Sequence, residues 1–530
     1  MKLLAAGVAA IGIAVTPALG QLLGQDLFPS NSPWNQNISN APVATNSASI
    51  IAAIGGSVKI HPDWGADSPT NGTSPLYGIP YNIVHGNSTA KISVIIDDYP
   101  GESDIVPAPI PANAVIEGDF QNGPNTNGPG YNPNQRGDSH LIIWDEDNNV
   151  GYEFYGAARP SDTNTIDETP HTDGKWHAAQ ETVWNYNTND FRPLGYTSAD
   201  AAGLSILAGL VWPDEGLPVS QGGQGEINHA MRMTLPGNIV GDQYIYPASH
   251  VVSESGNLPL GSRLRLKNNS TINALIATMG PESQIVAHAM QQYGLILADV
   301  GSAMYVTGAS AAVNSTNGIN LVWNLDDVLS GLEQLRASNF DVVNLTPAVT
   351  NLSQSAGAAG TRLTVEGYNF SGAAGHISMF FGNTNAPGTA PVVLSDSQIS
   401  VTVPAGSGTV NVTVQSGLYD PDKYDSPGAN VNGPIFGYGT SPTNAADKFT
   451  FVAGPKILRV FAKGGNFIMS GTNNSGSGGT YDVLVSTNLL LPLTNWVVLT
   501  SGSFDGLGDF SITNAISSTN VGKFYILRVP

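Results

Sequence analysis

The chain contains no cysteine, so disulfide bonds, thiolate metal sites and cysteine nucleophiles are excluded. Charged residues are also scarce, at 12% of 530 residues, and positive charge is the scarcer kind. Only 20 residues are lysine or arginine, against 41 aspartates and glutamates. The resulting net charge of -21 repels phosphate backbones, so we expect no nucleic-acid partner.

Long hydrophobic runs are absent too. The apolar run of residues 3–15 is too short to anchor a protein in a bilayer, and no later stretch approaches about 18 apolar residues. The mature protein is therefore expected not to be transmembrane. Because Lys2 precedes this run and Ala18 and Gly20 follow it, the pattern predicts a signal peptide over residues 1–20, cleaved after Gly20. We expect a protein that is secreted, either extracellular or at the cell surface.

The chain is rich in residues that favour strands and turns. Hydrophobic residues make up 41%, enough for sizeable cores, and there are 61 glycines. The sequence predicts a mainly β, multidomain protein. Its expected parts are a signal peptide (1–20), a catalytic or carbohydrate-active β domain (21–345), an immunoglobulin-like domain (346–453) and a C-terminal β module (454–530).

The first domain holds seven of the eight tryptophans and eight of the nine histidines, so chemistry is expected there. We expect a β-sandwich or jelly-roll-like architecture with a few helices. Residues 140–156 read as two strands around the acidic turn of residues 145–149, residues 225–235 alternate as a strand does, and residues 262–267 form another short alternating strand. Residues 281–293 and 326–337 have helical spacing.

Residues 347–451 read as short alternating strands with turn signals about ten residues apart, typical of a small β-sandwich. The segment resembles the IPT/TIG family of immunoglobulin-like domains. The features that match are Pro347, the Gly360-Thr361 turn, the Gly367-x-Asn369-Phe370 step, Phe381-Gly382 and the strand of residues 401–406. The resemblance implies a spacer or binding module and identifies no reaction. A Gly/Pro/Asn-rich insertion over residues 417–446 departs from the family pattern.

Four segments of the first domain resemble a family of uncharacterised secreted bacterial proteins: GDSHLIIWDEDNNVGYEFYGAARP, YTSADAAGLSILAGLVWPDEG, GEINHAMRM and YGLILADVGSAMYVTG. The resemblance supports one coherent domain and supplies no mechanism. Residues 455–530 are similar to a module that recurs in secreted proteins of environmental bacteria. A role of this module in cell-surface association stays open, and a solubilising cap is the simpler alternative.

Carboxylates are the leading candidates for catalysis, because cleavage of a glycosidic bond needs one protonated acid and one ionised base or nucleophile. Glu153 lies between Tyr152 and Phe154, and burial among rings would raise its pKa as an acid catalyst requires. The other candidates are Asp214, Glu215 and Glu226. The alternative is that such carboxylates are solvated or cap turns.

Two histidines complete the catalytic set. His140 shares a face with Glu153 if the hairpin loop spans residues 146–149, and not if the loop is one residue longer. His229 is expected on the apolar face of its strand, where a lone histidine is more often a hydrogen-bonded core residue. Because no H-x-H or HExxH spacing is present, no metal or other cofactor is expected, although a metal-dependent enzyme remains an alternative.

Aromatic residues in Asn-, Asp- and Gly-rich segments suggest sugar stacking. The expected substrate-binding residues are Trp212, Tyr155, Trp184, Trp176 and Arg232. The competing explanation for the rings is ordinary core packing. The leading hypothesis is therefore a glycoside hydrolase or lyase acting on an extracellular polysaccharide with paired carboxylates. A non-catalytic carbohydrate-binding or adhesion protein is the alternative.

Overall fold

The computed structural model describes residues 22–64, 78–119, 138–162, 172–252, 254–310, 321–370, 377–385, 391–416, 439–452, 454–473, 479–516 and 522–528. The predicted signal peptide lies outside these residues, as does most of the insertion expected over residues 417–446. The chain divides into two compact units, one running to Thr346 and the other starting at Pro347. In the described part, no helix is long and apolar enough to cross a membrane.

A six-stranded mixed sheet forms the larger part of the first unit. Its order is β1 (His61–Asp63), β13 (Tyr305–Thr307), β8 (Met231–Leu235), β12 (Leu295–Val300), β11 (Arg263–Leu266) and β14 (Phe340–Val342). The pair β8–β12 is parallel and lies at the centre, where both strands are largely buried. Parallel pairs need burial on both faces, which explains the apolar sequences of these two strands.

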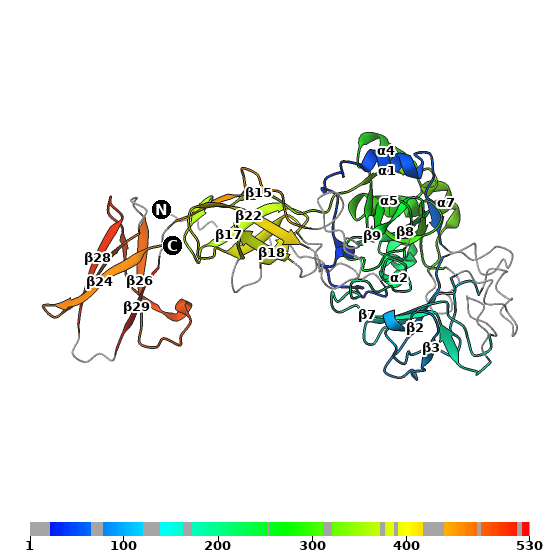
Figure 1. Cartoon of the computed structure of the whole chain (residues 1–530), viewed down its shortest axis with the longest axis horizontal. Helices are drawn as coiled ribbons and strands as arrows, with labels where there is room; N and C mark the ends of the chain where they lie inside the picture. Colours follow the sequence, from blue (N-terminus) through cyan, green and yellow to red (C-terminus); the bar gives the residue numbers. More distant parts are fainter. Residues whose placement is uncertain are drawn as a thin grey trace, which may run out of the picture. The chain divides into compact units, whose positions relative to one another are not determined.

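Helices pack beside this sheet (Figure 1). They are α1 (Ser47–Ile54), α4 (Ser270–Ile276), α5 (Pro281–Gln292) and α7 (Leu325–Leu332), and two one-turn helices are α2 (Ile206–Gly209) and α3 (Pro213–Gly216). Helix α5 begins at Pro281 after Gly280, and Gly294 follows it with φ of +73°. Because proline suits the first turn and a left-handed glycine ends a helix, the predicted helix over residues 281–293 is confirmed.

A four-stranded sheet makes up the other part of the first unit. Its order is β2 (Tyr81–Val84), β4 (Leu141–Asp145), β5 (Val150–Tyr155) and β7 (Gln180–Asn185). Two-stranded sheets pair β3 (Val94–Ile96) with β6 (Trp176–Ala178) and β9 (Val240–Tyr244) with β10 (Leu258–Leu260). The β4–β5 register pairs Ile142 with Glu153, so the hairpin loop spans residues 146–149.

Most tryptophans of the first unit are core residues. Trp34, Trp64, Trp144, Trp184, Trp212 and Trp323 belong to one buried cluster, with exposures of 3% or less. A second cluster lies under the four-stranded sheet and includes Leu141, Ile143 and Phe154. Packing therefore explains Trp184 and Trp212, two of the four aromatic residues for which the sequence also suggested sugar stacking.

The second unit is built of strands, with one short 3-10 helix, η7 (Leu493–Asn495), in its described part. The earlier strands form two sheets. The first has the order β15 (Ala348–Leu352), β17 (Arg362–Tyr368), β21 (Gln398–Thr402) and β20 (Val392–Ser395). The second has the order β16 (Ala356–Gly357), β23 (Lys448–Phe451), β22 (Thr409–Ser416), β18 (Ile377–Phe381) and β19 (Thr384–Asn385). The later strands form two three-stranded sheets. One has the order β24 (Lys456–Lys463), β25 (Asn466–Thr472) and β28 (Asp509–Ala515), and the other has the order β27 (Val497–Ser503), β26 (Thr480–Ser486) and β29 (Phe524–Arg528). The prediction of a mainly β, multidomain protein is confirmed. The exact domain boundaries remain a prediction.

Two local expectations need correction. The predicted strand over residues 225–235 begins only at Met231, because the preceding residues form hydrogen-bonded turns around Glu215. The helix expected over residues 326–337 spans Leu325–Leu332. The predicted strand over residues 262–267 is present as β11.

Candidate functional site

A cavity of about 230 Å³ opens in the first unit where β5 and β12 end. We call it the Asp299 pocket. Its lining residues are Tyr99, Asp138, Tyr155, Gln180, Thr197, Ser198, Ala199, Ala201, His250, Val252, Asp299 and Val300. Tyr155 ends β5, whereas Asp299 and Val300 end β12, so both main sheets contribute to the pocket.

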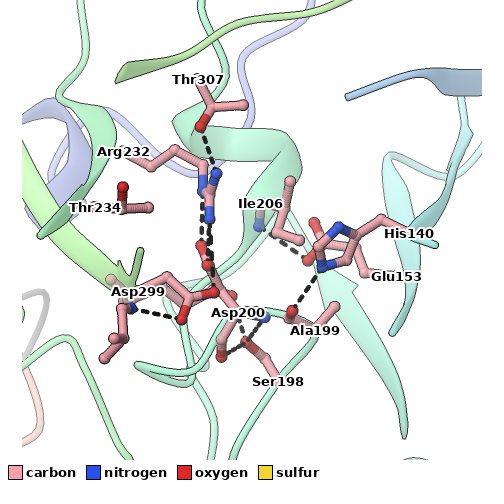
Figure 2. A network of polar contacts seen from close by, with 12 residues as sticks. His140, Glu153, Ser198, Ala199, Asp200, Ile206, Arg232, Thr234, Asp299 and Thr307 are labelled. Carbon is pink, nitrogen blue, oxygen red and sulfur yellow. Dashed lines mark hydrogen bonds and ion pairs between the residues drawn. The ribbon is translucent and has the colours of Figure 1, made fainter. Parts of the chain in front are cut away.

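Behind the pocket wall, two carboxyl groups and one guanidinium meet (Figure 2). Arg232 donates from Nε to Asp200 at 2.9 Å, and its Nη2 donates to the other oxygen of the same carboxylate. Its Nη1 donates to Thr307 Oγ1 at 2.6 Å. Asp299 is hydrogen-bonded to Asp200, and its Oδ2 lies 3.9 Å from Arg232 Nη2. The arrangement is a carboxyl pair beside a single cation.

The two aspartates have different surroundings. The Asp200 side chain has no exposed surface, whereas the Asp299 side chain is 22% exposed and lines the pocket. Burial and the neighbouring Asp200 carboxylate raise the pKa of the Asp299 carboxyl well above its usual range, against the opposing effect of Arg232. Asp299 therefore holds its proton at higher pH than an ordinary aspartate, as two adjoining carboxyl groups do when they cannot both ionise.

A β-bulge sets the position of Asp299. The register between β12 and β8 shifts between Leu297 and Asp299. The bulged segment leaves the carbonyl of Ala298 free to accept from Ala202 N at 2.9 Å, which fastens the loop carrying Asp200 to the end of β12. Bulges often re-aim a side chain next to an active site, and here the bulge brings two carboxyl groups together.

A buried histidine supports the same loop from the other side. His140 Nδ1 lies 2.6 Å from Glu117 Oε2, and its Nε2 lies 3.0 Å from the carbonyl oxygen of Ala199, a pocket residue. Burial disfavours the charged ring, but Glu117 outweighs it and raises the pKa of His140 to about 9. A protonated His140 donates to both partners, so it holds the pocket wall in place. Its ring also contacts that of Tyr155, with centroids 5.9 Å apart.

The pocket has a negative electrostatic character. Burial raises the pKa of Tyr155, and with the added effects of nearby Asp138, Tyr99, Asp299 and Asp98 it reaches about 12. Asp138 is exposed and also lines the pocket. His250 donates from Nδ1 to the carbonyl oxygen of Ala201 at 2.9 Å, and Glu102 Oε2 lies 3.8 Å from its Nε2.

Glu153, the first candidate for the acid, lies buried among hydrogen-bond donors. Its side chain has no exposed surface and accepts five hydrogen bonds. The donors are Trp184 Nε1 at 3.0 Å, Tyr186 OH at 3.2 Å, Ser205 Oγ at 2.8 Å, and the backbone N–H groups of Ile206 and Leu207, each at 2.9 Å. Burial raises the pKa of Glu153, and the hydrogen bonds from Leu207 and Ile206 oppose that rise. Glu153 thus ties β5 to the start of α2 and does not face the pocket.

We expect Glu153→Gln to lower the free energy of unfolding by roughly 2–4 kcal/mol. One carboxylate oxygen becomes an N–H₂ group, so the donors that bonded to that oxygen lose their acceptor and face another donor. The measurement is urea unfolding of the purified full chain followed by tryptophan fluorescence. Glu333→Gln is the matched control, since Glu333 is 40% exposed in a surface pair with Lys59. It should cost at most about 1 kcal/mol. Equal stability of the two variants would contradict this structural role.

The Asp214–Glu215 pair and His229 form a second buried group. His229 Nε2 lies 2.8 Å from Glu215 Oε1, and its Nδ1 lies 2.8 Å from the carbonyl of Ala230. Glu215 also accepts from Trp212 N at 3.3 Å, and Asp214 accepts from Leu23 N at 3.3 Å. These side chains are 7% exposed or less. The group holds turns together, and the structure does not place it on the Asp299 pocket.

The remaining candidates divide between core and surface. Trp212 is fully buried against Tyr81, with ring centroids 4.5 Å apart, and Trp184 is buried at Glu153, so neither offers a ring face to a sugar. Trp176 is half-buried in β6, and Glu226 is exposed. Of the residues named from sequence, only Tyr155 lines the pocket directly, while His140 and Arg232 support it from behind.

Sequence reasoning missed Asp200, Asp299 and Asp138 as candidates. Each lies in one of the segments that carry the family resemblance, in the strings TSADAA, LADVGS and GDSH. An aspartate preceded by a buried apolar run, as in LILAD, is the signal that could have found Asp299. Within the described residues, no group of three or more His, Asp or Glu side chains has an arrangement that could hold a metal ion.

Residues 347–427 match the family model of the IPT/TIG domain. The chain contains an IPT/TIG domain. This confirms the resemblance inferred from Pro347, Gly360, Phe370 and the strands around them.

No curated protein matches the chain. Similar solved structures include a putative phosphatase from Bacteroides thetaiotaomicron at 18% identity, covering 24% of this chain and 20% of that one, with a TM-score of 0.15. An auxiliary nutrient binding protein from Bacteroides ovatus has 16% identity, coverage of 22% and 24%, and a TM-score of 0.15. A Bacteroides ovatus mixed-linkage glucan utilization protein in complex with a heptasaccharide has 14% identity, coverage of 34% and 48%, and a TM-score of 0.13. The chain spans less than half of each, and at these TM-scores the likeness carries no argument about function.

Proposed function

We propose that the protein is an extracellular enzyme that cleaves a polysaccharide with the carboxyl groups of the Asp299 pocket. The observation that carries the proposal is the Asp200–Asp299 pair at the pocket wall, where the pKa of Asp299 is raised while Arg232 balances Asp200. A protonated carboxyl group at the edge of a cavity is what a general acid requires. A perturbed titratable group in a cleft is also the usual mark of a functional site.

In this proposal Asp299 is the acid and Asp138 is the base or nucleophile. Both line the same pocket, and Asp138 is the more exposed of the two. Tyr155 and Tyr99 offer rings to a sugar, and Tyr99 is 46% exposed. Arg232, Asp200 and His140 are positioning residues, because they hold Asp299 and the loop of Ala199 without facing the cavity themselves.

A non-catalytic carbohydrate-binding protein is the second candidate. The exposed ring of Tyr99 and the IPT/TIG domain favour it, since both occur in binding modules as readily as in enzymes. The two candidates differ in one respect, which is whether the bound polymer is cut.

The experiment is a screen of the purified full chain against a panel of polysaccharides, with detection of new reducing ends and, in parallel, retention of the protein on each insoluble or immobilised polymer. We expect reducing ends to accumulate on at least one polymer. Retention without any product would favour the binding protein instead. Neither product nor retention on a broad panel would overturn both candidates.

A further inference from the structure

The charge of the Asp299 pocket limits what it can accept. Among the described residues that line it, two are aspartates and none is lysine or arginine. Two guanidinium groups lie behind the described lining, Arg232 at 5% exposure and Arg192 at 4%. Arg232 is paired with Asp200 and Arg192 with Asp104, so neither presents an unpaired charge to an acidic group of a substrate.

The surroundings of the pocket add negative charge. Burial, together with nearby Asp138, Tyr99, Asp299 and Asp98, raises the pKa of Tyr155 to about 12. His250 is the one lining residue that can become cationic among those described, and Glu102 lies 3.8 Å from its Nε2. A carboxylate or sulfate brought into this pocket would face the Asp138 carboxylate with no lysine or arginine among the described lining residues, which is costly in a partly desolvated site.

We propose that the substrate of the Asp299 pocket is a polysaccharide without acidic groups, neutral or amino-bearing, and that it is cut by hydrolysis and not by β-elimination. This inference rests on the proposed function. Elimination removes a proton next to the carboxylate of a uronic acid, and it depends on a cation or strong donors to stabilise the extra negative charge that develops there. The described lining holds no lysine or arginine for this role, and its one histidine, His250, lies beside Glu102. Hydrolysis of a neutral sugar instead passes through a positively charged, oxocarbenium-like transition state that aspartates stabilise.

In the proposed step, one proton moves from Asp299 to the leaving sugar and another moves from water to Asp138. Asp299 gives its proton to the glycosidic oxygen while the bond from that oxygen to the anomeric carbon breaks. A water oxygen forms the new bond to the anomeric carbon, and Asp138 takes the proton that this water releases. One water is consumed, two hydroxyl ends are formed, and exchange with solvent returns the proton from Asp138 and restores that of Asp299.

The test uses the full chain on neutral polymers (a β-glucan and a galactomannan), an amino polymer (chitosan) and acidic polymers (polygalacturonate and alginate). Reducing ends report hydrolysis, and the ultraviolet absorbance of unsaturated uronates reports elimination. We expect reducing ends from a neutral or amino polymer and no unsaturated product. Cleavage of polygalacturonate or alginate would overturn this inference while leaving the proposed function standing. Absence of cleavage on every polymer would overturn the proposed function, and this inference with it.

A matched substrate pair sharpens the test. The polymer that is cut is compared with the same polymer after oxidation of its primary alcohols to carboxylates, and we expect cleavage to slow about a hundredfold or more. Ala201→Lys, which adds a cation to the lining, should narrow that difference about tenfold, whereas Ala201→Gln, of similar length and uncharged, should not. Equal rates on both forms of the polymer would overturn the inference.

Discussion

Asp299→Asn is expected to lower kcat on the cleaved polymer by about 10²–10⁴-fold, the usual contribution of a general acid. The amide keeps the size of the side chain, and its N–H₂ group can donate to Asp200 where the carboxyl proton does now. Folding and polymer retention should therefore persist while proton donation is lost. The measurement is kcat and KM from reducing ends, beside retention on the same polymer.

The pH profile separates an acid from a merely structural residue. Because burial and Asp200 raise the pKa of Asp299, the wild-type kcat should fall as pH rises through that pKa and the proton is lost. Asp299→Asn should have no such alkaline limb in its residual activity. Asp242→Asn is the control, since it makes the same chemical change at an exposed position on β9 that does not line the pocket. A wild-type rate in Asp299→Asn would remove Asp299 from the mechanism.

The fold could largely be predicted because its signals are local. Pro281 and the glycine that follows α5 bound that helix, and alternating residues with turn signals marked the IPT/TIG strands. The strand expected from residue 225 failed for a tertiary reason: residues before Met231 make hydrogen bonds to Glu215, which no alternation pattern contains. Periodicity describes one segment, whereas these turns depend on two.

The site was harder to predict, because burial decides what a carboxylate can do. Glu153 does lie among rings as its sequence neighbours suggest, but five donors from β7, Tyr186 and α2 surround it and leave no opening. Asp299 has an unremarkable sequence context, and it becomes a candidate only through a bulge in β12 and the approach of Asp200 from a loop about a hundred residues earlier. Contacts between such distant residues cannot be read from spacing alone.

Arg232→Met is expected to lower the free energy of unfolding by about 3–5 kcal/mol, because it leaves the fully buried Asp200 carboxylate without its cation. Urea unfolding followed by tryptophan fluorescence measures the loss. The double variant Arg232→Met/Asp200→Asn should recover part of the lost stability, since the buried Asp200 carboxylate that lost its cation is then replaced by a neutral amide. If Asp200→Asn lowers the free energy of unfolding by the same amount in the Arg232→Met variant as in the wild type, the two side chains do not act as a pair.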